Sequence, residues 1–253
     1  MDATQIKPGC WSISLGFVNA FLLDTGDGLS LIDTGVAGSG PRIAEALRSI
    51  GKQPADVRRI LVTHCHSDHA GSLAELKRLT GATATMYSID AAMVREGRAI
   101  RPLTPAPGLF NAFVCRFLVV KAPTEVEPAE IESEAQDGEI LPGGIRAIHI
   151  PGHCAGQLAF LWPEHGGVLI AADAAANVFG LQMSPLYEDL EEGRRSLAKL
   201  AALDFEVACF GHGKPILSGA PGGSAELAGR SGGPRSGRRE PSECRPVGPY
   251  GSG

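Results

Sequence analysis

The 253-residue sequence contains no run of about 18 unbroken apolar residues, the minimum for a helix that crosses a membrane. Its first residues, Met-Asp-Ala-Thr-Gln-Ile-Lys-Pro-Gly, also lack the basic start and apolar stretch that an export signal requires. Both absences argue against export and against a membrane as a partner. We therefore expect a cytoplasmic protein.

Paired cysteine spacings and an excess of positive charge are likewise missing. The six cysteines are scattered, so in a chain without an export signal we expect reduced thiols rather than disulfides. The formal net charge of -5 offers no attraction to a phosphate backbone, which disfavours nucleic acid as a partner. The sequence does not define the oligomeric state.

The last part of the chain differs in composition from the rest. From Gly219 to Gly253 the residues are mostly Gly, Pro, Ser and Arg, and no segment there can offset its ordering entropy by burial. We expect one compact domain over residues 1–218 and a disordered tail over residues 219–253. The closing Pro-Tyr-Gly-Ser-Gly resembles appended sequence, so whether the tail is native stays open.

Strand-like and helix-like stretches alternate before the tail. The predicted strands are residues 17–23, 29–33, 59–63, 82–87, 145–150, 158–162, 168–172 and 206–210. The predicted helices are residues 41–50, 68–79 and 190–203, and prolines within residues 89–137 suggest a lid. Strands followed by a helix, twice over, indicate an α/β fold with two sheets face to face and helices outside. This is a four-layer α/β/β/α sandwich.

Chemistry-bearing residues concentrate directly after the predicted strand 59–63. The segment Thr63-His64-Cys65-His66-Ser67-Asp68-His69 holds three imidazoles and a carboxylate within six residues. Alternation in an extended segment puts His64 and His66 on one face, where both can reach one ion. Asp68 and His69 approach from another direction as the chain turns into the predicted helix, which suits a second ion. Ser67 or Asp68 is the expected cap of that helix.

Three more candidates follow predicted strands, each in a turn of small residues: His153, Asp173 and His212. Strand ends of a sandwich share an edge, so we expect these side chains to meet the first cluster there. The neighbouring Gly152 and Gly211 permit close backbone approach. Because five of the seven histidines belong to this set, the sequence predicts a metal site.

This pattern resembles the metal-binding signature of the metallo-β-lactamase-fold hydrolases, over about residues 15–217. The signature is specific because four separate segments agree in type and order, through His64, His66, Asp68, His69, His153, Asp173 and His212. Leu31-Ile32-Asp33-Thr34-Gly35 also resembles the early turn of the family, in which the Asp33 carboxylate would support the metal ligands from outside. The resemblance implies an α/β/β/α sandwich of the metallo-β-lactamase type.

The resemblance further implies two metal ions with separate ligand sets. One ion would be bound by His64, His66 and His153, the other by Asp68, His69 and His212, and Asp173 would bridge both. Zinc suits these donors, although iron or manganese could occupy the same positions. A hydroxide shared by the two ions, bound and oriented with the help of Asp68, would be the nucleophile.

The bridging carboxylate of Asp173 resembles the thioesterase and lactonase branches more than the true β-lactamase branches. We therefore expect a zinc-dependent enzyme that hydrolyses an ester, thioester or lactone of a small, largely apolar substrate. Three alternatives stay open: β-lactam hydrolysis, iron-dependent redox chemistry of the sulfur dioxygenase kind, and metal-stabilised binding without turnover.

Candidates for a substrate pocket are weaker, because ordinary packing explains such residues equally well. They are Phe110, Phe113, Phe179, Met183 and Tyr187. Three cysteines close to proposed ligands, Cys65, Cys154 and Cys209, are expected to be small buried hydrophobes, with sensitivity to oxidation as a secondary property.

Overall fold

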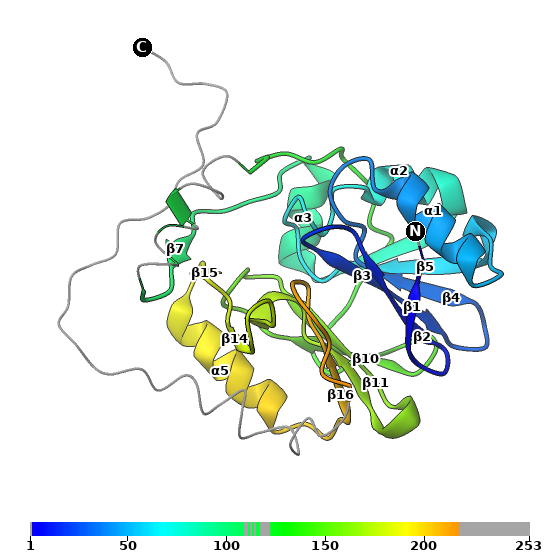
Figure 1. Ribbon diagram of the computed structural model, residues 1–253. Helices are drawn as coiled ribbons and strands as arrows, with labels where there is room; N and C mark the ends of the chain where they lie inside the picture. Colours follow the sequence, from blue (N-terminus) through cyan, green and yellow to red (C-terminus); the bar gives the residue numbers. More distant parts are fainter. Residues whose placement is uncertain (1, 109–110, 112, 114, 117–121, 218–253) are drawn as a thin grey trace, which may run out of the picture.

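The computed structural model of the chain describes residues 2–108, 111, 113, 115–116 and 122–217, so the tail predicted over residues 219–253 lies outside the described residues. Within this part, a seven-stranded sheet and a five-stranded sheet form the centre of the fold. Figure 1 shows helices α1, α2 and α3 beside the first sheet and α5 beside the second. The predicted α/β/β/α sandwich is confirmed.

The first sheet has the strand order β1-β2-β3-β4-β5-β6-β8. Its strands are β1 (Thr4–Lys7), β2 (Cys10–Ser14), β3 (Asn19–Asp24), β4 (Leu29–Ile32), β5 (Val57–Leu61), β6 (Thr83–Met86) and β8 (Ser133–Glu134). Strands β1 to β4 pair antiparallel, whereas β4, β5, β6 and β8 pair parallel. Parallel pairing brings the carboxyl ends of β4 and β5 to the same edge of the sheet.

The second sheet has the order β16-β12-β11-β10-β9. Its strands are β9 (Ile140–Leu141), β10 (Ile145–His149), β11 (Leu158–Trp162), β12 (Val168–Ile170) and β16 (Val207–Cys209). Strand β11 is antiparallel to both β10 and β12, and β12 is parallel to β16. Strands β10, β12 and β16 therefore run in one direction and end at one edge.

Two short strand pairs flank the main sheets: β7 (Thr104–Pro105) with β15 (Leu186–Tyr187), and β13 (Ala175–Ala176) with β14 (Gln182–Met183). The α-helices are α1 (Gly40–Ser49), α2 (Leu73–Thr80), α3 (Ser88–Arg95) and α5 (Leu190–Ala201). Within the described ranges, 3-10 turns cover Pro54–Asp56, Glu164–Gly166 and Ala172–Ala174. Of the helices in the described residues, none is long and apolar enough to cross a membrane.

The core has three layers because the strands are apolar on both faces. In β3, Ala20 and Leu22 pack with α1, α2 and α3, whereas Phe21 and Leu23 point to the second sheet. Leu197 and Leu200 of α5 cover the outer face of the second sheet. The two sheets thus share one apolar interface, with a helix layer on each outer side.

Phe160 of β11 lies fully buried in the interface between the two sheets. We expect Phe160→Ala to lower the free energy of unfolding by about 3–5 kcal/mol, because it removes a large apolar side chain and leaves a cavity. Urea denaturation would measure the change. Phe113→Ala, at a side chain that is 55% exposed, is the control and should have little effect. Equal losses in the two variants would contradict the described interface.

Most predicted elements between residues 17 and 210 are confirmed, but two expectations near the site are wrong. Helix α2 begins at Leu73 rather than Asp68 and follows Ser72, so neither Ser67 nor Asp68 caps it. The reason is tertiary: the His69 carbonyl accepts hydrogen bonds from the backbone N–H and the hydroxyl of Thr34, both at 2.7 Å. That carbonyl is therefore occupied outside the helix. The structure also places a helix, α3 (Ser88–Arg95), over the first part of the lid predicted within residues 89–137.

Candidate metal centre

The first cluster of the candidate site forms in the loop after β5. His64 is fully buried and His66 nearly so. The loop turns both imidazoles the same way, with His64 Nε2 3.1 Å from His66 Nδ1. The sequence prediction that these two side chains share a face is therefore confirmed.

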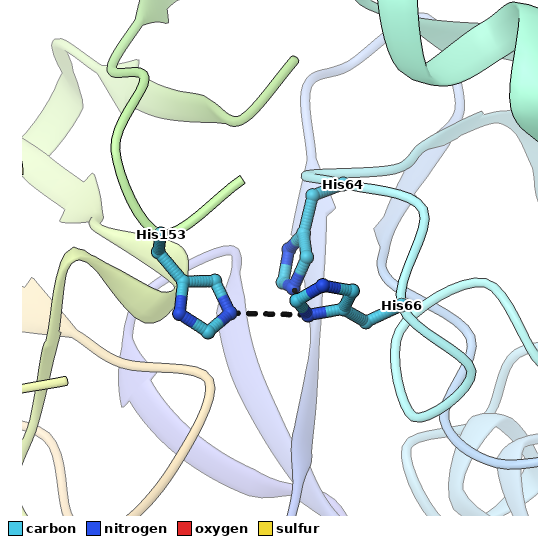
Figure 2. A group of neighbouring side chains, drawn as sticks. All are labelled: His64, His66 and His153. Carbon is cyan, nitrogen blue, oxygen red and sulfur yellow. Dashed lines mark hydrogen bonds between the residues drawn. The ribbon is translucent and has the colours of Figure 1, made fainter. Parts of the chain in front are cut away.

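His153 joins them from the second sheet, in the loop after β10. Its Nε2 atom also lies 3.1 Å from His66 Nδ1. Figure 2 shows the three rings turned toward one another across the gap between the two loops. Two nitrogen ligands at 2.0–2.1 Å from one tetrahedral zinc ion lie about 3.3 Å apart. The spacing of the three-histidine group, His64, His66 and His153, is close to this value.

A second group gathers on the other side of Asp173. His212 Nε2 lies 3.1 Å from Asp173 Oδ2 and 3.4 Å from Asp68 Oδ2. His69 Nε2 lies 3.5 Å from Asp173 Oδ1 and 3.9 Å from Asp68 Oδ2. Asp68, His69 and His212 thus form a second set of neighbouring donors, the acid-containing group.

Asp173 stands between the two groups. Besides its contacts with His69 and His212, its Oδ2 atom lies 3.6 Å from His153 Nε2 of the three-histidine group. The 3-10 turn after β12 places this carboxylate, and Ala172 before it adopts a left-handed backbone with φ 50°. All seven residues predicted from the sequence are therefore brought together at the shared edge of the sheets.

Unpaired polar atoms test whether the residues fit a cation. Among the described residues, His66 Nε2, His69 Nε2 and Asp173 Oδ1 are buried without a hydrogen-bond partner. Burying a polar atom without a partner costs free energy, so such atoms are rare unless a ligand satisfies them. The unpaired His69 atom belongs to the acid-containing group, and the unpaired Asp173 atom belongs to the carboxylate between the two groups. In the three-histidine group, ring nitrogens converge on His66 Nδ1. The donor set fits divalent metal ions.

The two groups differ in charge. Burial lowers the pKa of His66 to about 3, and His153 acts in the same direction. Burial likewise holds the pKa of His64 well below its ordinary value. These imidazoles are neutral at neutral pH, so their lone pairs are available without loss of a proton.

Carboxylates reverse this balance in the acid-containing group. Burial opposes the charge of His69, but Asp173, Asp68 and Asp33 outweigh it and raise its pKa well above the ordinary value. Burial also opposes the charge of His212, yet Asp173 raises its pKa to about 9. The pKa of Asp173 is held well below its usual range despite burial, chiefly by His212 and His69. This side of the site attracts positive charge.

Contacts behind the rings fix their orientation. His64 Nδ1 lies 2.9 Å from the Thr63 hydroxyl, and His153 Nδ1 lies 2.8 Å from the Leu186 carbonyl. His212 Nδ1 donates to the Phe17 carbonyl at 2.8 Å, and the Phe17 ring stacks on His212. No sequence pattern points to the Leu186 and Phe17 carbonyls, because every residue carries a backbone carbonyl.

Asp33, predicted to support the metal ligands from outside, does contact them. Its Oδ2 atom accepts a hydrogen bond from His69 Nδ1 at 2.8 Å, which directs Nε2 of the same ring into the site. The backbone N–H and hydroxyl of Thr63 donate to the two Asp33 oxygens at 2.8 and 2.9 Å. One buried carboxylate thus orients a ring of the acid-containing group and the start of the loop after β5.

We expect Asp33→Asn to weaken metal affinity about 10–100-fold, because the amide cannot accept from all three donors. Competition with a chromophoric chelator would measure the loss. Asp24→Asn is the matched control, since Asp24 pairs with Lys52 at the far end of the same hairpin. A parental affinity in Asp33→Asn would refute this role.

The predicted pocket residues differ in how far they are exposed to solvent. Phe110 lies outside the described residues. Phe179 is 86% exposed, Phe113 is also exposed and Met183 is partly buried. Tyr187 is fully buried, and its hydroxyl donates to the Ala174 carbonyl at 3.3 Å. Tyr187 therefore supports the site from behind and does not face a substrate.

The cysteines near the proposed ligands behave as expected. Cys65, Cys154 and Cys209 are fully buried, and burial raises the pKa of the Cys154 and Cys209 thiols. These three thiols are free, as is that of Cys10. The expectation of reduced thiols throughout is wrong at Cys115, which is disulfide-bonded.

A sandwich of two sheets between helix layers, with paired histidine and carboxylate groups at its edge, defines a class of metal-dependent hydrolases. The comparison with known families agrees. The model of the metallo-beta-lactamase superfamily matches residues 13–212, so the chain belongs to that superfamily and is an enzyme with a metal site.

Individual relatives are distant. The chain is 29% identical to the uncharacterized protein YobT of Bacillus subtilis, over 79% of this chain and 85% of that protein. It is 27% identical to the thioesterase pkgB of Emericella nidulans, over 84% of this chain and 50% of the relative. A hydroxyacylglutathione hydrolase of Cereibacter sphaeroides is 28% identical, with 76% of this chain and 61% of the relative covered.

Solved structures show the same fold. A metallo-beta-lactamase of Cronobacter sakazakii with an HARLDQ motif superposes with a TM-score of 0.66 and 26% identity. The match covers 84% of this chain and 78% of the neighbour. The chain thus shares the lactamase architecture.

Proposed function

We propose that the chain is a binuclear, zinc-dependent hydrolase of small, largely apolar esters, thioesters or lactones. The observation that carries the proposal is the sharing of Asp173 by two donor groups. The three-histidine group would hold one ion, the acid-containing group would hold the other, and Asp173 would bridge them. Iron or manganese could occupy the same donors.

Bound ions at such a site would make a water acidic near neutral pH and polarise the scissile carbonyl. Side chains of the protein would orient the water and carry its proton. Asp68 faces the open side, with its side chain 24% exposed and Oδ2 3.4 Å from His212 Nε2. This oxygen would orient the attacking water and take up its proton. As the carbonyl carbon bonds to the water oxygen and its bond to the leaving group breaks, the proton would pass to the leaving alkoxide or thiolate.

Exposed apolar side chains beside the site support an apolar substrate. The exposed fractions of Phe17, Val178 and Phe179 are 64%, 50% and 86%. Phe17 stacks on His212, and the segment before Val178 hydrogen-bonds to the His212 backbone through Asn177 N–H. The named activities of the thioesterase and hydroxyacylglutathione hydrolase relatives support a thioester as one substrate class.

β-Lactam hydrolysis is the second candidate function, and the Cronobacter sakazakii metallo-beta-lactamase favours it. The carboxylate of Asp173 at the shared position favours the thioester and lactone classes, as the sequence pattern implies. Rates on matched substrates decide between the two candidates.

The test joins metal analysis with a substrate panel. Protein purified without added metal would be assayed for bound metal and for hydrolysis of a small ester, thioester, lactone and β-lactam. We expect two zinc ions per chain and turnover of the first three classes that a chelator abolishes and zinc restores. Iron with oxygen consumption would replace the proposal by redox chemistry, and metal without turnover would replace it by binding alone.

A further inference from the structure

A buried carboxylate outside the ligand set joins the two loops of the three-histidine group. Asp90 of α3 is fully buried. Its Oδ2 atom accepts hydrogen bonds from the Cys65 backbone N–H and from the Cys154 thiol, both at 3.0 Å. Cys65 stands between His64 and His66, and Cys154 follows His153. One oxygen atom therefore contacts both ligand-bearing loops.

Arg101 extends this connection to a third segment. Its guanidinium donates to Asp90 Oδ1 at 2.8 Å and to Glu188 Oε1 at 3.1 Å. Glu188 Oε2 in turn accepts from the Ala155 backbone N–H at 3.0 Å, and Glu188 N–H donates to the His153 carbonyl. The series of contacts from Asp90 through Arg101 to Glu188 thus holds the His153 loop at two points. Asp90 accepts from the Cys154 thiol, and Glu188 accepts from the Ala155 backbone N–H.

Charge and space both favour this arrangement. A buried carboxylate is costly unless it is paired and hydrogen-bonded, and Arg101 supplies the opposite charge while Cys65 and Cys154 supply donors. A Cβ atom at Gly156 would lie 2.5 Å from the Asp90 carboxyl group, so close approach of the loop depends on glycine there. The distance between the Cys65 and Cys154 sulfur atoms is 3.7 Å, which shows how closely the loops meet.

We infer that Asp90, Arg101 and Glu188 are positioning residues that hold the His64–His66 loop and the His153 loop at the separation a metal ion requires. The inference rests on the proposed function, because it assigns the three-histidine group to a metal. The loops come from different sheets. One backbone hydrogen bond joins their ends, from Leu158 N–H to the Thr63 carbonyl at 2.8 Å, and beside the histidines the contacts of Asp90 set the distance between the loops. Outer contacts of this kind are worth about 10–100-fold in metal affinity.

The test is metal affinity, measured by competition with a chromophoric chelator and independent of hydrolysis. An Asp68→Asn background weakens the acid-containing group and leaves all donors of the three-histidine group in place. In that background we expect Asp90→Ala to bind zinc about 10–100-fold more weakly. Asp90→Asn should recover part of this loss, since its amide oxygen can still accept from Cys65 and Cys154.

Arg101→Gln provides a second variant if Asp90→Ala does not fold, because the Arg101 side chain is partly exposed. Arg98→Gln is the matched control, since Arg98 is exposed and pairs with Glu96. We expect weaker zinc binding in Arg101→Gln and unchanged binding in Arg98→Gln, with similar thermal unfolding of both metal-free proteins.

Three outcomes would overturn the inference in distinguishable ways. Parental zinc affinity in folded Asp90→Ala or Arg101→Gln refutes the positioning role and leaves the proposed function intact. Failure of the unaltered chain to bind zinc, iron or manganese refutes both. A loss of affinity matched by an equal loss in Arg98→Gln would also refute the assignment, because the effect would not depend on contact with Asp90.

Discussion

Asp173→Ala is expected to lower kcat/KM on the order of 10³-fold, the largest effect among the substitutions proposed for this chain. Asp173 is the one carboxylate of the described residues that contacts His69, His153 and His212 together. Its removal takes a donor from both groups and leaves the charge of His69 and His212 less compensated. A bound metal contributes several kcal/mol to transition-state stabilisation, which corresponds to a rate loss on the order of 10³-fold.

Steady-state rates on the best substrate of the panel and metal content would be measured on the same preparations. We expect kcat/KM to fall with the number of ions retained per chain. Asp204→Ala, at an exposed carboxylate beyond α5, is the matched control and should keep both values. Retention of two ions and full turnover by Asp173→Ala would show that the two donor groups act without a shared carboxylate.

The clustering of the seven candidate residues could be predicted from the sequence because each of them lies shortly after a predicted strand. The apolar run Ile60-Leu61-Val62 at the end of β5 and the apolar strand β12 stand out in the sequence. Parallel pairing of β5 with β4 and of β12 with β16 sends the residues that follow each pair to one edge of its sheet. His64 and His66 alternate by two, which predicts a common face before any fold is known. The prediction depended only on the alternation of residues and on which residues follow strands. The folded structure retains both features.

Other parts of the site could not be predicted, because tertiary contacts decide them. The start of α2 moves to Leu73 because Thr34, from a distant turn, occupies the His69 carbonyl. Asp90 stands in a helix where a carboxylate usually faces water, and the approach of Cys65, Arg101 and Cys154 buries it. Neither contact leaves a periodic or compositional signal in the sequence.

Tyr187 shows a further limit of sequence reasoning. An aromatic residue with a hydroxyl near a predicted site reads equally as pocket lining or as packing. The structure places Tyr187 against Gly193 of α5, where an added Cβ would lie 2.3 Å from its ring, and leaves the side chain fully buried. The backbone of α5, the helix that directly follows Tyr187, thus decides the packing of this residue.

Gly211 makes the second prediction of large effect, because the site depends on a missing side chain there. A Cβ atom at this position would lie 2.1 Å from Asp173 Oδ1 and 2.7 Å from His69 Cε1. The backbone cannot retreat easily: Gly211 N–H donates to the Ala172 carbonyl at 3.0 Å, and its own carbonyl accepts from Asn19 N–H at 2.8 Å. The strain must therefore fall on Asp173 and His69.

Gly211→Ala should displace the shared carboxylate and lower kcat/KM on the order of 100-fold, the scale expected for misplacement of a catalytic group by about 1 Å. Metal content should fall with it, and the free energy of unfolding of the metal-free protein should fall by about 1–3 kcal/mol, because the added methyl group overpacks a buried site. Gly40→Ala is the matched control: its added Cβ meets only the flexible end of Glu75, away from the site. If Gly211→Ala kept parental metal content and turnover, Asp173 and His69 could not both need the positions described, and the assignment of Asp173 as the shared ligand would have to be withdrawn.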